Sequence, residues 1–129
     1  MFDECTSEAL TEGIRITVRS EYQPSHSRPG QFVFAYRVQI LNENPYDVML
    51  RSRHWIIVDQ MGEREDVEGP GVVGEQPTLS EREAFVYTSG AALPTPRGLM
   101  RGTYTFDGPR GTFKAEIAEF ALAAPNTLN

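Results

Sequence analysis

Residues 51–55 hold the densest group of side chains able to bind a ligand or a partner protein. Arg51, Arg53, His54 and Trp55 all occur there, inside the strand-like sequence RSRHWIIVD. In a strand, alternation puts Arg51, Arg53 and Trp55 on one face and His54 on the other, unless a bulge intervenes. An arginine stacked on the Trp55 ring could then anchor an anion or a protein partner. A tryptophan in this setting more often lies in the core of a sandwich, with the arginines as charges at the strand edge, and we favour that arrangement.

A glycine-rich loop with the sequence GPGVVG follows soon after. Gly69, Gly71 and Gly74 match the G-x-G-x-x-G pattern of dinucleotide-binding folds. In those folds the pattern opens a helix whose N-terminal amides bind pyrophosphate, whereas Glu75 and Gln76 lead here into a proline with no helical pattern after it. We therefore expect a structural loop, in which glycine permits positive φ angles. The alternative is a site where residues 69–74 and a nearby arginine hold a phosphate or pyrophosphate-like anion.

The sequence contains no pattern of catalytic or metal-binding residues. His26 and His54 are far apart and lack the spacing of metal ligands. Cys5 is the only cysteine, which leaves no intramolecular disulfide and no thiolate-rich metal site. Ser52 and Ser89 lack the G-x-S-x-G context of a hydrolase nucleophile. We expect a protein that is not an enzyme and has no catalytic residue, cofactor or metal site.

Short strands separated by turns must position these residues. Alternating apolar residues predict strands at 14–18 and 32–41, one or two strands between 48 and 59, a short acidic edge strand at 65–68, a strand around 85–87, and a terminal hairpin of 100–106 with 112–122. Glycine and proline predict long loops at 69–80 and 89–98. A β-bulge near Ala118 and Glu119 would bring the apolar residues on both sides of it to one face. Since no amphipathic helix is indicated, the pattern predicts an all-β antiparallel sandwich or barrel.

Length and charge limit the architecture and the partners. The 129 residues suit one domain, at 13–124, between tails at 1–12 and 125–129, and the first tail could contain a helical turn at 7–11. A net charge of −6 makes nucleic acid a poor partner. The apolar runs are far shorter than the roughly 20 residues that span a bilayer, and the acidic N-terminus is unlike a signal peptide, so we expect a cytoplasmic protein with no membrane segment. We expect a monomer or a weak homodimer, because open sandwiches leave edge strands that can pair.

The sequence resembles the ApaG family over most of its length. The resemblance is carried by Phe34-Ala35-Tyr36, by Arg53-His54-Trp55, by the string GVVGEQP at 71–77, by Tyr87 with Ser89-Gly90, and by Thr95-Pro96. It implies a fibronectin type III-like or immunoglobulin-like sandwich of two antiparallel sheets. It also implies an association with cobalt resistance and magnesium efflux in bacteria, without an established reaction. Related eukaryotic domains occur in an F-box protein and in a polymerase-delta-interacting protein, which implies a protein-binding module.

Residues and resemblance together predict a non-enzymatic β-sandwich that binds another protein, of unknown identity, and affects Co²⁺ and Mg²⁺ homeostasis indirectly. The alternative, from a different class, is a small-molecule protein that binds a phosphate or pyrophosphate-like anion with residues 69–74.

Overall fold

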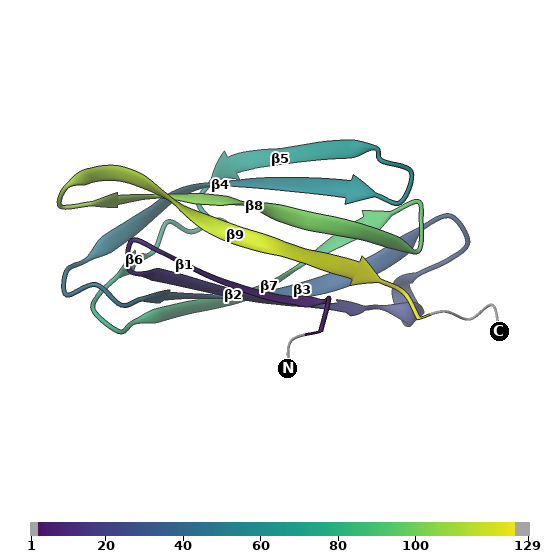
Figure 1. Ribbon diagram of the computed structural model, residues 1–129, viewed down its shortest axis with the longest axis horizontal. Helices are drawn as coiled ribbons and strands as arrows, with labels where there is room; N and C mark the ends of the chain where they lie inside the picture. Colours follow the sequence, from purple (N-terminus) through teal and green to yellow (C-terminus); the bar gives the residue numbers. More distant parts are fainter. Residues whose placement is uncertain (1–2, 126–129) are drawn as a thin grey trace.

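The computed structural model describes residues 3–125, which form two antiparallel sheets packed face to face (Figure 1). The first sheet has the order β1-β2-β3-β7, with β1 at Thr6–Thr11, β2 at Ile14–Tyr22, β3 at Phe32–Asn42 and β7 at Ala84–Leu93. The second has the order β5-β4-β8-β9, with β4 at Val48–Asp59, β5 at Arg64–Pro70, β8 at Arg97–Gly108 and β9 at Gly111–Ala123. The short strand β6 at Thr78–Leu79 also pairs with β4, and a 3₁₀ turn, η1, lies at Pro24–His26. Among residues 3–125, no helix has the length and apolar character needed to cross a membrane. The expected all-β sandwich of two antiparallel sheets is confirmed.

The core lies between the sheets, where alternate residues of each strand point inward. On β2, Ile14, Ile16 and Val18 are fully buried, whereas the residues between them are not. The facing sheet contributes large aromatic side chains, among them Trp55 and Tyr104. Burying an aliphatic or aromatic side chain of this size stabilises the fold by roughly 1.5–3 kcal/mol. The period-two alternation of the sequence is therefore what divides each strand into a core face and an outer face.

A β-bulge in β9 lets two sets of apolar residues face the core. Ala118 and Glu119 together oppose the single residue Arg101 on β8. As a result, Ile117 before the bulge and Phe120 after it are both buried, although they differ in parity along the strand. The predicted bulge is confirmed.

The N-terminal tail expected at residues 1–12 is wrong for residues 6–11, and so is the helical turn. Residues 6–11 form β1, which pairs antiparallel with β2. The segment has little apolar periodicity of its own, so tertiary contacts hold it, including a 2.7 Å hydrogen bond from the Ser7 hydroxyl to the Ala118 carbonyl. Residues 1–2 and 126–129, at the outer ends of the expected tails, lie outside the described residues.

The boundaries of the two expected loops also differ from the prediction. Residues 89–93 belong to β7, because they pair with residues 32–36 of β3 despite their glycine and alanine content. Residues 97–98 begin β8, which leaves a short connection at 94–96. In the glycine-rich segment, β5 extends to Pro70 and β6 forms before Ser80, so only the residues between them are irregular.

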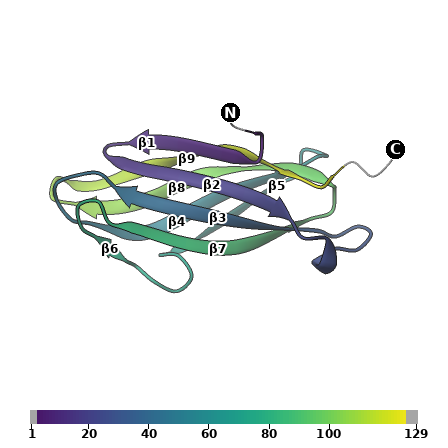
Figure 2. The same cartoon turned by 90° about the horizontal axis from the view of Figure 1, so that it is seen from below.

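One side of the sandwich is closed and the other is open. On the closed side, the Ser20 hydroxyl donates a 2.6 Å hydrogen bond to the Ala121 carbonyl of β9, and the Ala121 amide donates to the Glu4 carbonyl at 2.6 Å. On the open side lie β7 and β5, the edge strands of the two sheets, each paired with one neighbour only. Figure 2 shows β1 and β7 at opposite edges of the nearer sheet.

Candidate binding groove

Three cavities lie in a row on the open side, between β7 and the strands β4 and β5. Their volumes are about 220, 390 and 150 Å³. The first and second share Arg53 and Ser89 among their lining residues, and the second and third share Ile57 and Ala92. They form one continuous depression, bounded by parts of residues 87–94, 53–59 and 63–67, with Tyr36, Val72 and Val73. We name this depression the β7 groove.

The groove exists because the inward side chains of β7 are small in the middle of the strand. Tyr87 and Leu93 are large and buried, whereas Ser89 and Ala91 between them are small. Residues that pair with them on β3 are inward-facing aromatics, and Trp55 of β4 also borders the space. The small side chains of β7 thus leave a gap between the sheets. Neither the neighbouring aromatic residues of β3 nor Trp55 on the facing sheet fills it.

Arg53 supplies the positive charge of the first and second cavities. It is half-buried, and its Nη1 donates hydrogen bonds of 3.0 Å to the carbonyl oxygens of Pro70 and Gly71. A β-carbon at position 69 would lie 3.0 Å from Nη2, so Gly69 leaves room for the guanidinium. Among residues 3–125, no carboxylate lies within ion-pair distance of Arg53. In the described part of the chain Arg53 therefore forms no ion pair, although Glu65 lines the same cavity.

Three tyrosines extend from this region into the core. The hydroxyls of Tyr87 and Tyr104 hydrogen-bond to each other. Burial raises the pKa of Tyr87 to about 12 and raises the pKa of Tyr104 well above its usual range. Burial also raises the pKa of Tyr36, although the nearby Ser89 side chain and the charge of Arg53 oppose the change. All three phenols are therefore protonated at neutral pH and can donate hydrogen bonds.

Trp55 lies in the core and also forms one wall of the groove. The side chain is only 2% exposed. Its ring centroid is 5.2 Å from that of Tyr36 and 6.0 Å from that of Phe120, which contacts the ring edge-on. This placement agrees with the core position that we favoured for Trp55. The arginines are not charges at a strand edge, because β4 lies between β5 and β8 in its sheet.

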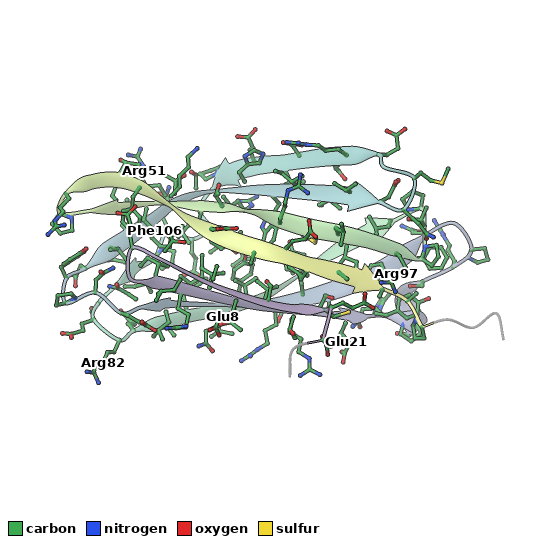
Figure 3. All side chains as sticks on the ribbon, in the orientation of Figure 1. Glu8, Glu21, Arg51, Arg82, Arg97 and Phe106 are labelled. Carbon is green, nitrogen blue, oxygen red and sulfur yellow. The ribbon has the colours of Figure 1, made fainter. Side chains whose placement is uncertain are left out.

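Arg51 and His54 lie outside the groove. A register shift between Leu50 and Ser52 is the interruption that the predicted alternation excluded, and it separates Arg51 from the face that Arg53 and Trp55 share. Arg51 is exposed on the outside of its sheet and forms an ion pair of 3.3 Å with Asp107 (Figure 3).

His54 faces away from the core, and its Nε2 lies 2.7 Å from Asp66 Oδ2. Hydrogen bonds from Arg64 and then from His54 hold the pKa of the Asp66 carboxyl well below its usual range. Among residues 3–125 there is no cluster of three or more His, Cys, Asp or Glu side chains suited to a metal ion.

The glycine-rich loop is held by its own hydrogen bonds. The Gly71 amide donates to the Arg51 carbonyl at 2.7 Å, and the amides of Val72 and Glu75 each donate to the other residue's carbonyl at 2.8 Å. The side-chain amide of Gln76 also donates to the Arg51 carbonyl, at 2.9 Å. Gly71 and Gly74 have φ angles of +60° and +80°, as a structural loop requires.

These hydrogen bonds limit the ability of the loop to bind an anion through its backbone amides. The backbone amides of three loop residues are already engaged, and between residues 76 and 125 no helix follows to direct further amides at an anion. Val72 is fully buried and anchors the loop to the core. Because Val72 and Val73 line the cavity of about 220 Å³, the loop forms an end wall of the groove.

Several lining residues were missed as site residues from the sequence, although a signal was present. Tyr36, Tyr87 and Ser89 occur in the short strings that carry the family resemblance. The small residues of the groove follow from alternation along TSGAAL, in which positions 89 and 91 share a face. The glycine, alanine and proline residues in and after that segment favour a loop and mask this alternation.

Comparison with known proteins identifies close relatives. The family model described as ApaG domain matches residues 22–108. A "Protein ApaG" of Anaeromyxobacter dehalogenans is 52% identical over 95% of this chain and 99% of the relative, and one of Rhodospirillum centenum is 48% identical over 91% and 92%. The crystal structure of a "Putative ApaA Protein" from Bordetella pertussis has a TM-score of 0.84 and 48% identity over 88% of this chain and 95% of that chain.

Proposed function

The chain belongs to the ApaG domain family, and on that premise we propose that it is a non-catalytic module that binds an extended segment of another protein along β7. The observation that carries the proposal is an unprotected edge. β7 spans 10 residues, pairs only with β3, and contains no charged residue in its sequence AFVYTSGAAL. Edge strands of soluble proteins normally carry charges, prolines or bulges against pairing, and an edge without them readily accepts a further strand.

The other edges are less suited to accept a strand. β5 is acidic, with carboxylates at three of its seven positions. β1 and β9 face each other on the closed side, joined by the hydrogen bond from Ser7 to Ala118. The β7 edge is therefore favoured, and the groove beside it offers space for side chains of an added strand.

No reaction is part of the proposal, and the names of the relatives state none. The family resemblance implies an effect on Co²⁺ and Mg²⁺ homeostasis, and we attribute this effect to the bound partner. We place the interaction in the cytoplasm.

Two lysine substitutions on β7 test the proposal. Ala91→Lys puts a long charged side chain into the groove, whereas Thr88→Lys puts the same side chain on the exposed outer face of the same strand. Wild-type chain captures proteins from a lysate of the source cell, and mass spectrometry identifies them. We expect a partner that Thr88→Lys retains and Ala91→Lys loses, with similar melting temperatures for the two variants. In cells lacking the wild-type chain, Thr88→Lys should restore cobalt tolerance and Ala91→Lys should not.

Hydrogen exchange with the purified partner then locates the contact. The amides of β7 should become protected, and those of β1 and β5 should change little. A partner that binds Ala91→Lys as tightly as wild type, or that protects another edge, would overturn the proposal. Light scattering of the isolated chain tests self-pairing through β7, for which we expect no more than a weak dimer.

A further inference from the structure

We propose that the partner segment places one acidic side chain in the middle cavity of the β7 groove, where Arg53 binds its carboxylate. This inference rests on the proposed function, because it concerns the segment that pairs with β7. It adds a chemical class to that segment, namely an extended peptide with an aspartate or glutamate at one inward position.

The position follows from strand geometry. A strand added to the free edge of β7 lies about 4.8 Å from it in the same sheet, with side chains that alternate between the two faces. β7 lies at the margin of the sheet opposite β1 and has no second strand partner, although β6 and the loop beside it are drawn beyond part of that margin (Figure 2). An inward side chain level with Ser89 and Ala91 enters the cavity of about 390 Å³ between the sheets, since both residues line that cavity. Arg53 lines the same cavity from the opposite sheet.

The charge follows from the unused donors of Arg53. A guanidinium has five N–H groups, and the hydrogen bonds of Arg53 to residues 3–125 all come from Nη1. Its Nε and Nη2 are left for a ligand. A half-buried cation without a counter-ion is costly, and a carboxylate that accepts charge-assisted hydrogen bonds removes that cost.

The rest of the cavity suits a short aliphatic stem rather than a second charge. Trp55, Ile57 and Val67 line it beside Arg53, and Glu65 also lines it, so a second acid in the cavity would meet a like charge. Toward the far end of the groove, the lining includes three acidic residues and one arginine, Arg64, which is already paired with Asp66, so a run of acidic residues would be repelled. The segment therefore carries a single acid at the level of Arg53.

A display library of random dodecapeptides tests the inference on the intact chain. Peptides selected on wild type should be enriched in aspartate or glutamate at one position, and selection on Arg53→Gln should lose this enrichment. Arg37→Gln is the matched control, because Arg37 is an exposed arginine on the outer face of β3. If no peptide binds the β7 edge, the proposed function fails. If peptides bind this edge without an acidic position, only the present inference fails.

A thermodynamic cycle with one selected peptide gives the decisive measurement. Changing its acidic residue to the corresponding amide should weaken binding to wild type about tenfold or more, as expected for a charged hydrogen-bonded pair. The same change should have little effect on binding to Arg53→Gln and the full effect on binding to Arg37→Gln. Equal losses against all three proteins would overturn the inference. The peptide substitution needs only wild-type protein, so a result is obtained even if Arg53→Gln does not fold.

Discussion

Replacing Gly71 with alanine tests whether the glycine-rich loop is held by its own backbone. Gly71 has a φ angle of +60°, and an added β-carbon would lie 2.0 Å from the Glu75 carbonyl oxygen. That oxygen accepts the hydrogen bond from the Val72 amide. The substitution must therefore both strain the backbone at position 71 and displace the carbonyl that closes the loop.

The cost can be estimated from these two effects. An alanine in the left-handed region costs about 1 kcal/mol relative to glycine. Moving Glu75 weakens the two backbone hydrogen bonds between Val72 and Glu75, each contributing about 1 kcal/mol. We expect Gly71→Ala to lower the free energy of unfolding by about 3 kcal/mol. Gly74→Ala is the control, because Gly74 has a φ angle of +80° with no atom within 4 Å of the added β-carbon, and it should cost about 1 kcal/mol.

Urea denaturation with linear extrapolation measures both variants. If their unfolding free energies agree to within about 0.5 kcal/mol, the clash with Glu75 has no energetic consequence and the reasoning is refuted. Melting curves with added pyrophosphate test the alternative function, in which the loop binds an anion. If the loop binds pyrophosphate, the ligand should raise the melting temperature of wild type and not that of Gly71→Ala. If the loop is only structural, pyrophosphate should change neither melting temperature.

Trp55→Ala should lower the free energy of unfolding by about 3–5 kcal/mol, because the removed ring is 2% exposed and packs against Tyr36 and Phe120. A loss below about 1 kcal/mol in urea denaturation would contradict this packing. The free energy of unfolding should also fall as the pH rises from 10 toward 12. Burial raises the pKa of Tyr87 from 10.0 to about 12, so the unfolded state loses the Tyr87 proton at lower pH than the folded state does. The stabilisation from the buried, protonated phenol is therefore fully present below pH 10 and is lost as the pH approaches 12. In denaturation series over that interval, Tyr87→Phe should reduce the slope of stability against pH by up to about 1.4 kcal/mol per unit, and an unchanged slope would argue against it.

Most of the fold could be predicted from local sequence patterns. Ile14, Ile16 and Val18 alternate with polar residues, and a half-buried strand is the structure that satisfies such a pattern. The bulge at Ala118 and Glu119 could also be predicted, because apolar residues of opposite parity on one strand can share a face only if an extra residue is inserted. These inferences need no knowledge of which strands are neighbours.

The segments that were predicted wrongly depend on such neighbours. Residues 6–11 have no apolar alternation of their own and become β1 because β2 offers a free edge. Residues 89–93 are rich in small side chains and become part of β7 because β3 pairs with them. A weak local preference is overridden when a partner strand satisfies the backbone hydrogen bonds.

For the candidate site, the sequence by itself determined the chemical groups and part of their order. It placed Arg53 two residues before an apolar tryptophan, and it placed glycines where the loop needs positive φ angles. Only the tertiary structure decided that a register shift turns Arg51 out of the group, that Ser89 and Ala91 lie in the cavity that Arg53 lines, and that the edge beside them is open. The physical reason is that alternation acts over neighbouring residues, whereas a groove is a space between two sheets, and its size depends on which side chains the packing of those sheets sets opposite one another.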